Sequence, residues 1–174
     1  MRTVRLHSRV ACFAGAVALL VQISPALASD HDQDNRPVEI TFTKWTAPPP
    51  ATPPTPFFGL LVGFAGDGLE GSFVGEVLWR QASLNGHVVG LTAMYEVVDE
   101  DGDRSFTALI RGGQNAAGAA HFDGVILSGW RAGARVQVVY QRYVAIAGMP
   151  SCAGAPVNKT CFEGTIHVER APRD

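Results

Sequence analysis

The stretch FVGEVLWRQASLNGHVVGLTAMYEV, from Phe73 to Val97, decides the fold class of this chain. Apolar residues recur at every second position in both halves, which is the pattern of two strands that each bury one face. That face carries Phe73, Gly75, Val77 and Trp79 in the first half and Val89, Leu91, Ala93, Tyr95 and Val97 in the second. Asn85 and Gly86 stand between the halves and are the residue pair that a type I′ turn prefers. The stretch therefore predicts an antiparallel hairpin.

Strand patterns continue on both sides of this hairpin, and no stretch has the period of a helix. Most segments are joined by short turns, which force neighbouring strands to be antiparallel. The six further segments are 38–42, 57–64, 106–110, 120–126, 136–140 and 162–168. We predict an all-β fold, a single eight-stranded antiparallel up-and-down barrel, because closure removes the unpaired strand edges. Glycines inside several strands favour the barrel over the alternative, a β-sandwich, because small barrels use them to bend sharply.

Residues 1–28 predict a signal peptide that is removed on export. Three arginines precede an apolar run of 12 residues, Val10–Val21, and small residues end the segment at Ala28. A membrane-spanning helix needs about 20 apolar residues, so we expect no membrane span in the mature form, which would begin at Ser29. The protein is therefore predicted to be secreted or periplasmic.

The remaining 146 residues are enough for one domain. Residues 29–37 are polar and predict a disordered leader, and residues 38–174 form the predicted barrel domain. Six of the eleven prolines fall within 48–56, which predicts an extended connector. Without the signal peptide, 16 acidic and 11 basic residues leave a net charge of −5 with neutral histidines. Such a surface repels phosphate backbones, so nucleic acid is not expected as a partner.

Two cysteines, Cys152 and Cys161, remain after signal removal. Export places them where disulfides persist, and we predict that they pair with each other. A zinc site would need further ligands at the right spacing, and the nearest histidine, His167, lies six residues beyond Cys161 on a predicted strand. Between the cysteines, Asn158 begins an N-glycosylation acceptor, which has meaning if the source is a eukaryote.

The strand-and-glycine rhythm of four segments resembles the allene oxide cyclase and dirigent barrel superfamily. The segments are GDGLEGSFVGEV (66–77), DGDRSFTALIRGG (101–113), GARVQVVYQ (133–141) and CFEGTIHV (161–168). The resemblance covers Phe57 to Arg170 and implies an eight-stranded antiparallel barrel with an apolar-lined cavity. The catalytic residues of the plant cyclases cannot be placed on this chain residue by residue. The resemblance therefore implies a fold and not an activity.

Three aromatic residues, Trp79, Tyr95 and Tyr140, lie on the predicted apolar faces. An eight-stranded barrel is wide enough to hold one small ligand. Aromatic walls with a polar tip suit an apolar guest. These three residues are therefore the candidate ligand-binding residues, with core filling as their alternative role.

Four carboxylates fall on the faces opposite the apolar stripes, namely Glu76, Glu96, Asp123 and Glu163. We expect them on the solvent-facing outside. An inverted barrel is the alternative: if an oligomer covered the apolar face, these acids would line the lumen together with His121 and Tyr143. Burial would then raise a carboxylate pKa for general acid catalysis. On that hypothesis the glutamates at 76, 96 and 163 are the candidate catalytic residues.

No cofactor is expected from the sequence. Gly66, Gly68 and Gly71 spell GxGxxG, but a strand follows where a dinucleotide site needs a helix N-terminus. No metal site is expected either, with one conditional exception. Cleavage after Ala28 would place His31 third behind a free α-amine, and these groups can offer four nitrogens in the square-planar geometry that Cu(II) favours.

Three functions are compatible with these patterns. The leading hypothesis is a non-catalytic binding module that takes an apolar small molecule into the barrel, since aromatic residues are present and catalytic motifs are not. The second is an isomerase or cyclase that steers a reactive, lipid-like substrate in the cavity and depends on a carboxylate inside. The third is an assembly domain, a homo-oligomer in which the 48–56 connector packs on a neighbouring subunit. The inward face of the strand at 73–79 distinguishes the first two.

Overall fold

The computed structural model describes residues 36–82 and 88–170. Several sequence predictions therefore lie outside the described residues, namely the signal peptide with its cleavage site, His31, most of the leader and the Asn85–Gly86 turn. Within the described ranges, no helix is long and apolar enough to cross a membrane.

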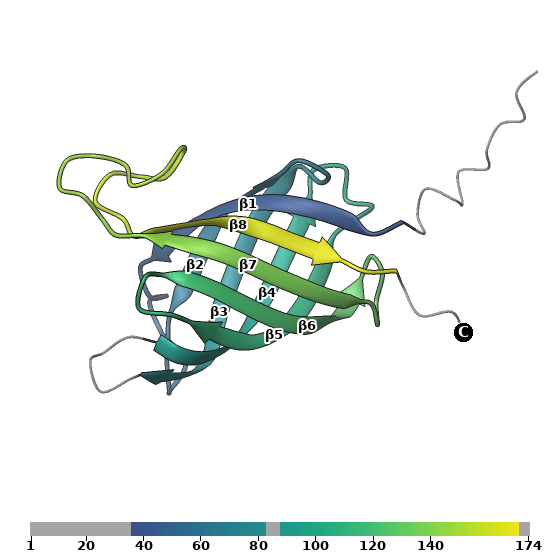
Figure 1. Ribbon diagram of the computed structural model, residues 1–174, viewed down its shortest axis with the longest axis horizontal. Coiled ribbons are helices and arrows are strands. Elements are labelled where there is room, and N and C mark those ends of the chain that lie inside the picture. The colour runs from purple at the N-terminus through teal and green to yellow at the C-terminus, as the bar shows by residue number, and fades with distance from the viewer. Residues whose placement is uncertain (1–35, 83–87, 171–174) are drawn as a thin grey trace, which may run out of the picture.

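Eight antiparallel strands close into one barrel, in which each strand pairs with its neighbours in sequence and β8 pairs with β1 (Figure 1). The strands are β1 (Val38–Ala47), β2 (Leu60–Gly66), β3 (Gly71–Ala82), β4 (Val88–Asp99), β5 (Phe106–Gln114), β6 (Ala119–Gly129), β7 (Arg135–Tyr143) and β8 (Cys161–Val168). The predicted up-and-down barrel is confirmed. The alternative sandwich is wrong, because the ladder between β1 and β8 closes the sheet.

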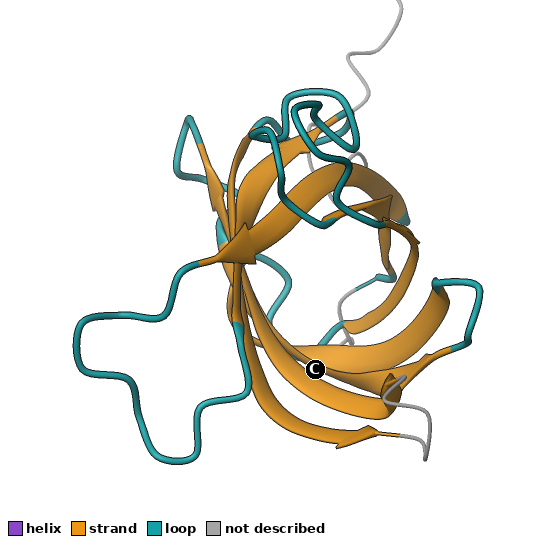
Figure 2. Cartoon of the chain, turned by 90° about the vertical axis from the view of Figure 1, so that its left-hand side faces the viewer, coloured by secondary structure: helices purple, strands orange, loops and turns teal. Residues whose placement is uncertain are grey.

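The two ends of the barrel differ (Figure 1). The described chain enters and leaves at one end, where β1 begins and β8 ends. At the opposite end, the long segment 144–160 joins β7 to β8 and projects from the barrel. We call this opposite end the disulfide end, and it faces the viewer in Figure 2. The proline-rich connector between β1 and β2 lies at the disulfide end as well, because an up-and-down barrel turns at alternate ends.

The inner face of the barrel is apolar, as the alternation in the sequence predicts. Ile40 and Phe42 on β1 and Val138 on β7 are at most 3% exposed. The polar residues between such positions face solvent, since the side chains of His121 and Asp123 on β6 are 60% and 69% exposed. The inverted barrel is therefore wrong.

A β-bulge in β3 reverses the predicted face of Trp79. The ladder with β4 skips Leu78, so that Trp79 pairs with Thr92 and Arg80 pairs with Leu91. An extra residue in one strand shifts the side-chain alternation by one position beyond it. The prediction that Trp79 shares the apolar face is wrong: its side chain lies on the outside, 43% exposed, and Arg80 takes the inner position.

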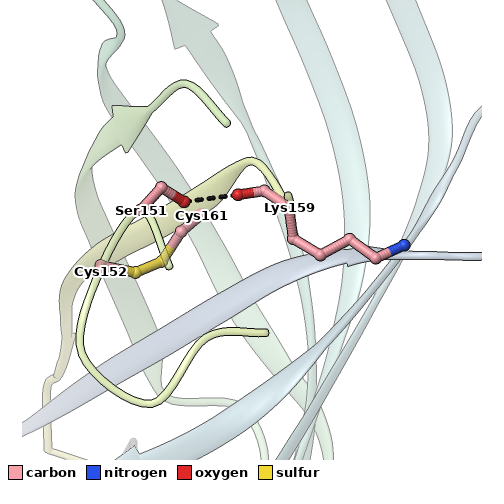
Figure 3. The surroundings of a disulfide bond; sticks show 4 residues. All are labelled: Ser151, Cys152, Lys159 and Cys161. Carbon is pink, nitrogen blue, oxygen red and sulfur yellow. Dashed lines mark hydrogen bonds between the residues drawn. A yellow bond between two sulfur atoms is a disulfide. The ribbon is translucent and has the colours of Figure 1, made fainter. Parts of the chain in front are cut away.

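The predicted pairing of Cys152 with Cys161 is present as a disulfide at the disulfide end, with the Cα atoms 6.2 Å apart (Figure 3). Cys161 is the first residue of β8 and is fully buried. Beside the disulfide, the Ser151 hydroxyl donates a hydrogen bond to the carbonyl oxygen of Lys159. The disulfide joins the 144–160 segment to the barrel wall, and the hydrogen bond closes the segment on itself.

Candidate functional site

Large side chains fill the middle of the barrel. Phe73, Tyr95 and Phe122 are each at most 1% exposed. The ring of Phe73 lies 4.7 Å from that of Tyr95 and 5.3 Å from that of Phe42, measured between centroids. Phe122 stacks on Tyr140 at 5.4 Å. The middle of the lumen is therefore a packed core, and space for a ligand has to be sought at the ends.

A cavity of about 220 Å³ lies at the disulfide end, next to this packed core. Its apolar lining comprises Phe58, Leu60, Leu61, Val77, Leu91 and Phe162. Tyr140 forms part of the wall that borders the core. Gly59 follows the proline-rich connector, and its carbonyl oxygen accepts a 3.0 Å hydrogen bond from the backbone N–H of Val77. This bond holds the chain that follows the connector against the cavity wall.

Two arginines, Arg80 and Arg142, line this cavity, and its lining includes no carboxylate. Arg142 continues the inward alternation of Val136, Val138 and Tyr140 along β7. Its Nε atom is buried and has no hydrogen-bond partner in the described part of the chain. Neither guanidinium pairs with a described carboxylate. The cavity thus combines an apolar wall with positive charge that the described residues leave uncompensated.

Lys44 lies one layer deeper, fully buried on the inner face of β1. Thr46, the next inward residue of β1, lines the cavity, whereas Lys44 does not. The Nζ atom of Lys44 donates a hydrogen bond to the hydroxyl of Tyr95. Nζ also lies 4.1 to 5.8 Å from the ring centroids of five aromatic residues, namely Phe42, Phe73, Tyr95, Tyr140 and Phe162. The last two of these rings also line the cavity.

Burial sets the protonation state of this cluster. Desolvation lowers the pKa of Lys44 well below its usual value, because no described carboxylate pairs with the ammonium ion. The surrounding rings attract a cation and oppose this shift in part. Burial raises the pKa of Tyr95, and the neighbouring Tyr140 raises it further. Above the lowered pKa of Lys44, this hydrogen bond joins a neutral amine to a phenol that keeps its proton.

The three predicted ligand-binding residues occupy three different environments. Tyr140 lines the cavity. Tyr95 is 1% exposed and lies in the packed core, bonded to Lys44. Trp79 lies on the outer face of the barrel. Only one of the three can therefore touch a guest in this cavity.

The three candidate catalytic glutamates lie outside the lumen. Glu76 and Glu96 are exposed. Glu163 is half-buried in a groove on the outer surface, which it shares with Thr41 and Thr165. None of the three lines the cavity, so these residues supply no internal acid.

Sequence reasoning missed Lys44, Arg80 and Arg142. Two of them carried a usable signal, because Lys44 continues the stripe that begins at Val38, and Arg142 continues the stripe of β7. A charged residue at the end of an apolar stripe is easily interpreted as the point where a strand leaves the core. Arg80 depends on the β-bulge at Leu78, for which the sequence shows no signal.

Neither a search for metal-binding side chains nor comparison with known proteins assigns a function to this site. Among the described residues, no group of three or more histidine, cysteine, aspartate or glutamate side chains could hold a metal ion. Comparison of the chain with family models, curated proteins and solved structures finds no match. The function of the cavity has to be inferred from its own geometry and chemistry.

Proposed function

We propose that this protein is an exported, non-catalytic binding module that takes an apolar small molecule into the cavity at the disulfide end. The observation that carries the proposal is the cavity itself, about 220 Å³ with a mainly apolar wall, beside a core that is otherwise filled. Ligand pockets are concave, mostly apolar and provided with a few polar groups that orient the guest. Tyr140, Arg80 and Arg142 are such groups here.

The size of the cavity limits the guest. Typical pockets for drug-sized ligands measure roughly 300 to 1,000 Å³, so this cavity suits a smaller molecule, such as a chain of about eight carbons. Tyr140 and Phe162 border both the cavity and the aromatic cluster around Lys44. The guest is therefore expected to stay near the end of the barrel.

Binding fits the site better than catalysis. The cyclase alternative requires an internal carboxylate, and the three candidate glutamates lie outside the lumen. Lys44 is fully buried and does not line the cavity, so its amine cannot reach a guest there. Its hydrogen bond to Tyr95 instead satisfies two polar groups inside the core.

Export supports this role and is itself part of the proposal. The disulfide between Cys152 and Cys161 is of the kind that persists in oxidising compartments. Together with the predicted signal peptide, it favours a secreted or periplasmic protein. The resemblance to the allene oxide cyclase and dirigent superfamily also implies an apolar-lined cavity within the barrel.

Isothermal titration calorimetry with 1-octanol as the ligand tests the proposal. Val77→Trp places a large ring in the cavity and is expected to abolish binding. Val139→Trp is the matched control, because Val139 lies on the outer face and is 47% exposed. We expect octanol to bind the wild type and the control variant only, with circular dichroism showing that all three proteins are folded. Equal affinity in all three, or no binding to the wild type, would overturn the proposal.

Assembly is a second candidate function, favoured by apolar side chains on the outer face. Phe64, Val98, Leu127 and Val139 are 41%, 42%, 50% and 47% exposed. These residues belong to four different strands, β2, β4, β6 and β7. A homo-oligomer would bury some of them, and binding at the disulfide end does not exclude such an assembly.

A further inference from the structure

Arg142 places a positive charge on the wall of a mainly apolar cavity. It holds the last inward position of β7, after Val136, Val138 and Tyr140, which are all at most 8% exposed. Its Nε donor is buried without an acceptor among the described residues. An unsatisfied buried donor costs about 1 to 3 kcal/mol, and more when the group is charged. Each such group in a native structure calls for an explanation, and a bound acceptor is one.

Arg80 brings a second positive charge to the same cavity. The β-bulge at Leu78 turns its side chain inward, opposite Leu91, and it lies on the cavity wall with Arg142. The lining includes no aspartate or glutamate, and no described carboxylate pairs with either arginine. The cavity is therefore a positive site on a chain whose predicted mature form carries a net charge of −5. A cleft lined by one sign of charge attracts small ions of the opposite sign.

Tyr140 supplies a neutral donor beside these charges. Burial raises the pKa of its hydroxyl, and the positive charge of Arg142 lowers it only in part. The phenol therefore keeps its proton at neutral pH. A phenolic O–H and a guanidinium on one wall form a donor set that suits an anionic acceptor.

We infer that the guest is an amphiphile with a carboxylate head on a short apolar chain, and that Arg142 and Arg80 bind the carboxylate. The planar fork of an arginine matches a carboxylate with two parallel hydrogen bonds. The chain would lie along Leu61, Val77 and Leu91, which line the same cavity. This inference rests on the proposed function and adds the chemical class of the ligand.

Octanoate and 1-octanol form the matched pair of probes, because they share a chain length and differ in charge at pH 7. Calorimetric titration of the wild type should give at least about tenfold tighter binding of octanoate, the typical gain from a charge-assisted hydrogen bond. In Arg142→Gln, the ratio of octanoate to octanol affinity should fall by about tenfold. Arg135→Gln should keep the wild-type ratio, because Arg135 is exposed at the opposite end of β7.

A second variant guards against loss of folding in Arg142→Gln. Arg80 is exposed, so Arg80→Gln is expected to leave the core intact and to lower the affinity ratio by about threefold or more. A wild-type ratio near one, or an unchanged ratio in both glutamine variants, would overturn the inference and leave the proposed function standing. Tighter binding of octylamine than of octanoate would also overturn it. Failure of every probe to bind would overturn the proposed function as well.

Discussion

Replacement of the buried lysine by methionine should change how the stability of the barrel depends on pH. Lys44→Met keeps an unbranched side chain of similar length and removes the amine. In the wild type, burial lowers the pKa of Lys44 from its usual 10.5. Between the lowered value and 10.5, the unfolded chain carries one more bound proton than the folded chain. The free energy of unfolding therefore rises with pH across this window, and the stability is lost as the pH falls.

The slope of stability against pH follows from the difference of one bound proton between the unfolded and the folded chain. The free energy of unfolding of the wild type should rise by about 1.4 kcal/mol per pH unit within the window, and Lys44→Met should lack this contribution. The variant also leaves the Tyr95 hydroxyl without its partner, which costs about 1 to 3 kcal/mol. That cost does not vary with pH below 10, because burial raises the pKa of Tyr95 above its usual 10.0. The difference in slope between the two proteins therefore isolates the lysine.

Urea unfolding followed by circular dichroism at several pH values below 10 measures this slope. Lys159→Met is the matched control, because Lys159 is the other lysine of the predicted mature chain and lies in the 144–160 segment. It should keep the wild-type slope. If Lys44→Met also kept that slope, the buried amine would be charged in the folded state. The attraction of the five rings would then outweigh desolvation, and the lowered pKa of Lys44 would be refuted.

Three further predictions concern the disulfide, the strand register and the oligomeric state. The double variant Cys152→Ser, Cys161→Ser should lower the free energy of unfolding by about 2 to 3 kcal/mol, which corresponds to a drop of roughly 5 to 10 °C in the thermal midpoint. An unchanged midpoint would show that the disulfide is not needed to hold the loop. Gly63→Ala should destabilise the barrel strongly, because the added carbon would overlap the backbone of Thr43 on β1. Gly66→Ala on the same strand is the control, because its added carbon would meet its nearest atom at 3.6 Å, an ordinary contact. Equal thermal midpoints for the two variants would contradict the β1–β2 register. Light scattering after size exclusion should show an oligomer if the outer apolar residues form an interface, and a monomer at high concentration would count against assembly.

The barrel could be predicted from the sequence because its information is local. Alternation marks each strand, and the short turns between them leave antiparallel neighbours as the only arrangement. Closure followed from the cost of unpaired edges. The face of each strand also followed from alternation, up to the point where β3 is interrupted. The bulge at Leu78 could not be predicted, because it depends on how β3 pairs with β4 and not on a residue type that marks it.

The candidate site was harder to predict, because whether an inward side chain lines the cavity depends on its position along the barrel axis. Alternation places Tyr95 and Tyr140 on the same face, but only the register shows that Tyr140 borders the end cavity while Tyr95 lies in the core. Lys44 was missed because a lysine on an inner face contradicts the rule that charged residues lie outside. Its burial needs the hydrogen bond to Tyr95, from a strand 51 residues away in sequence. Such long-range partners leave no local pattern.

Intermolecular nuclear Overhauser effects between a bound guest and the methyl groups of the barrel test most directly whether the guest lies in the end cavity. The guest would be octanoate, titrated to saturation against protein with assigned methyl resonances. We predict cross-peaks from the octanoate chain to Leu61, Val77 and Leu91, which line the cavity. Cross-peaks confined to Val98 and Val139 on the outer face, or none at saturating concentration, would contradict a binding site inside the barrel.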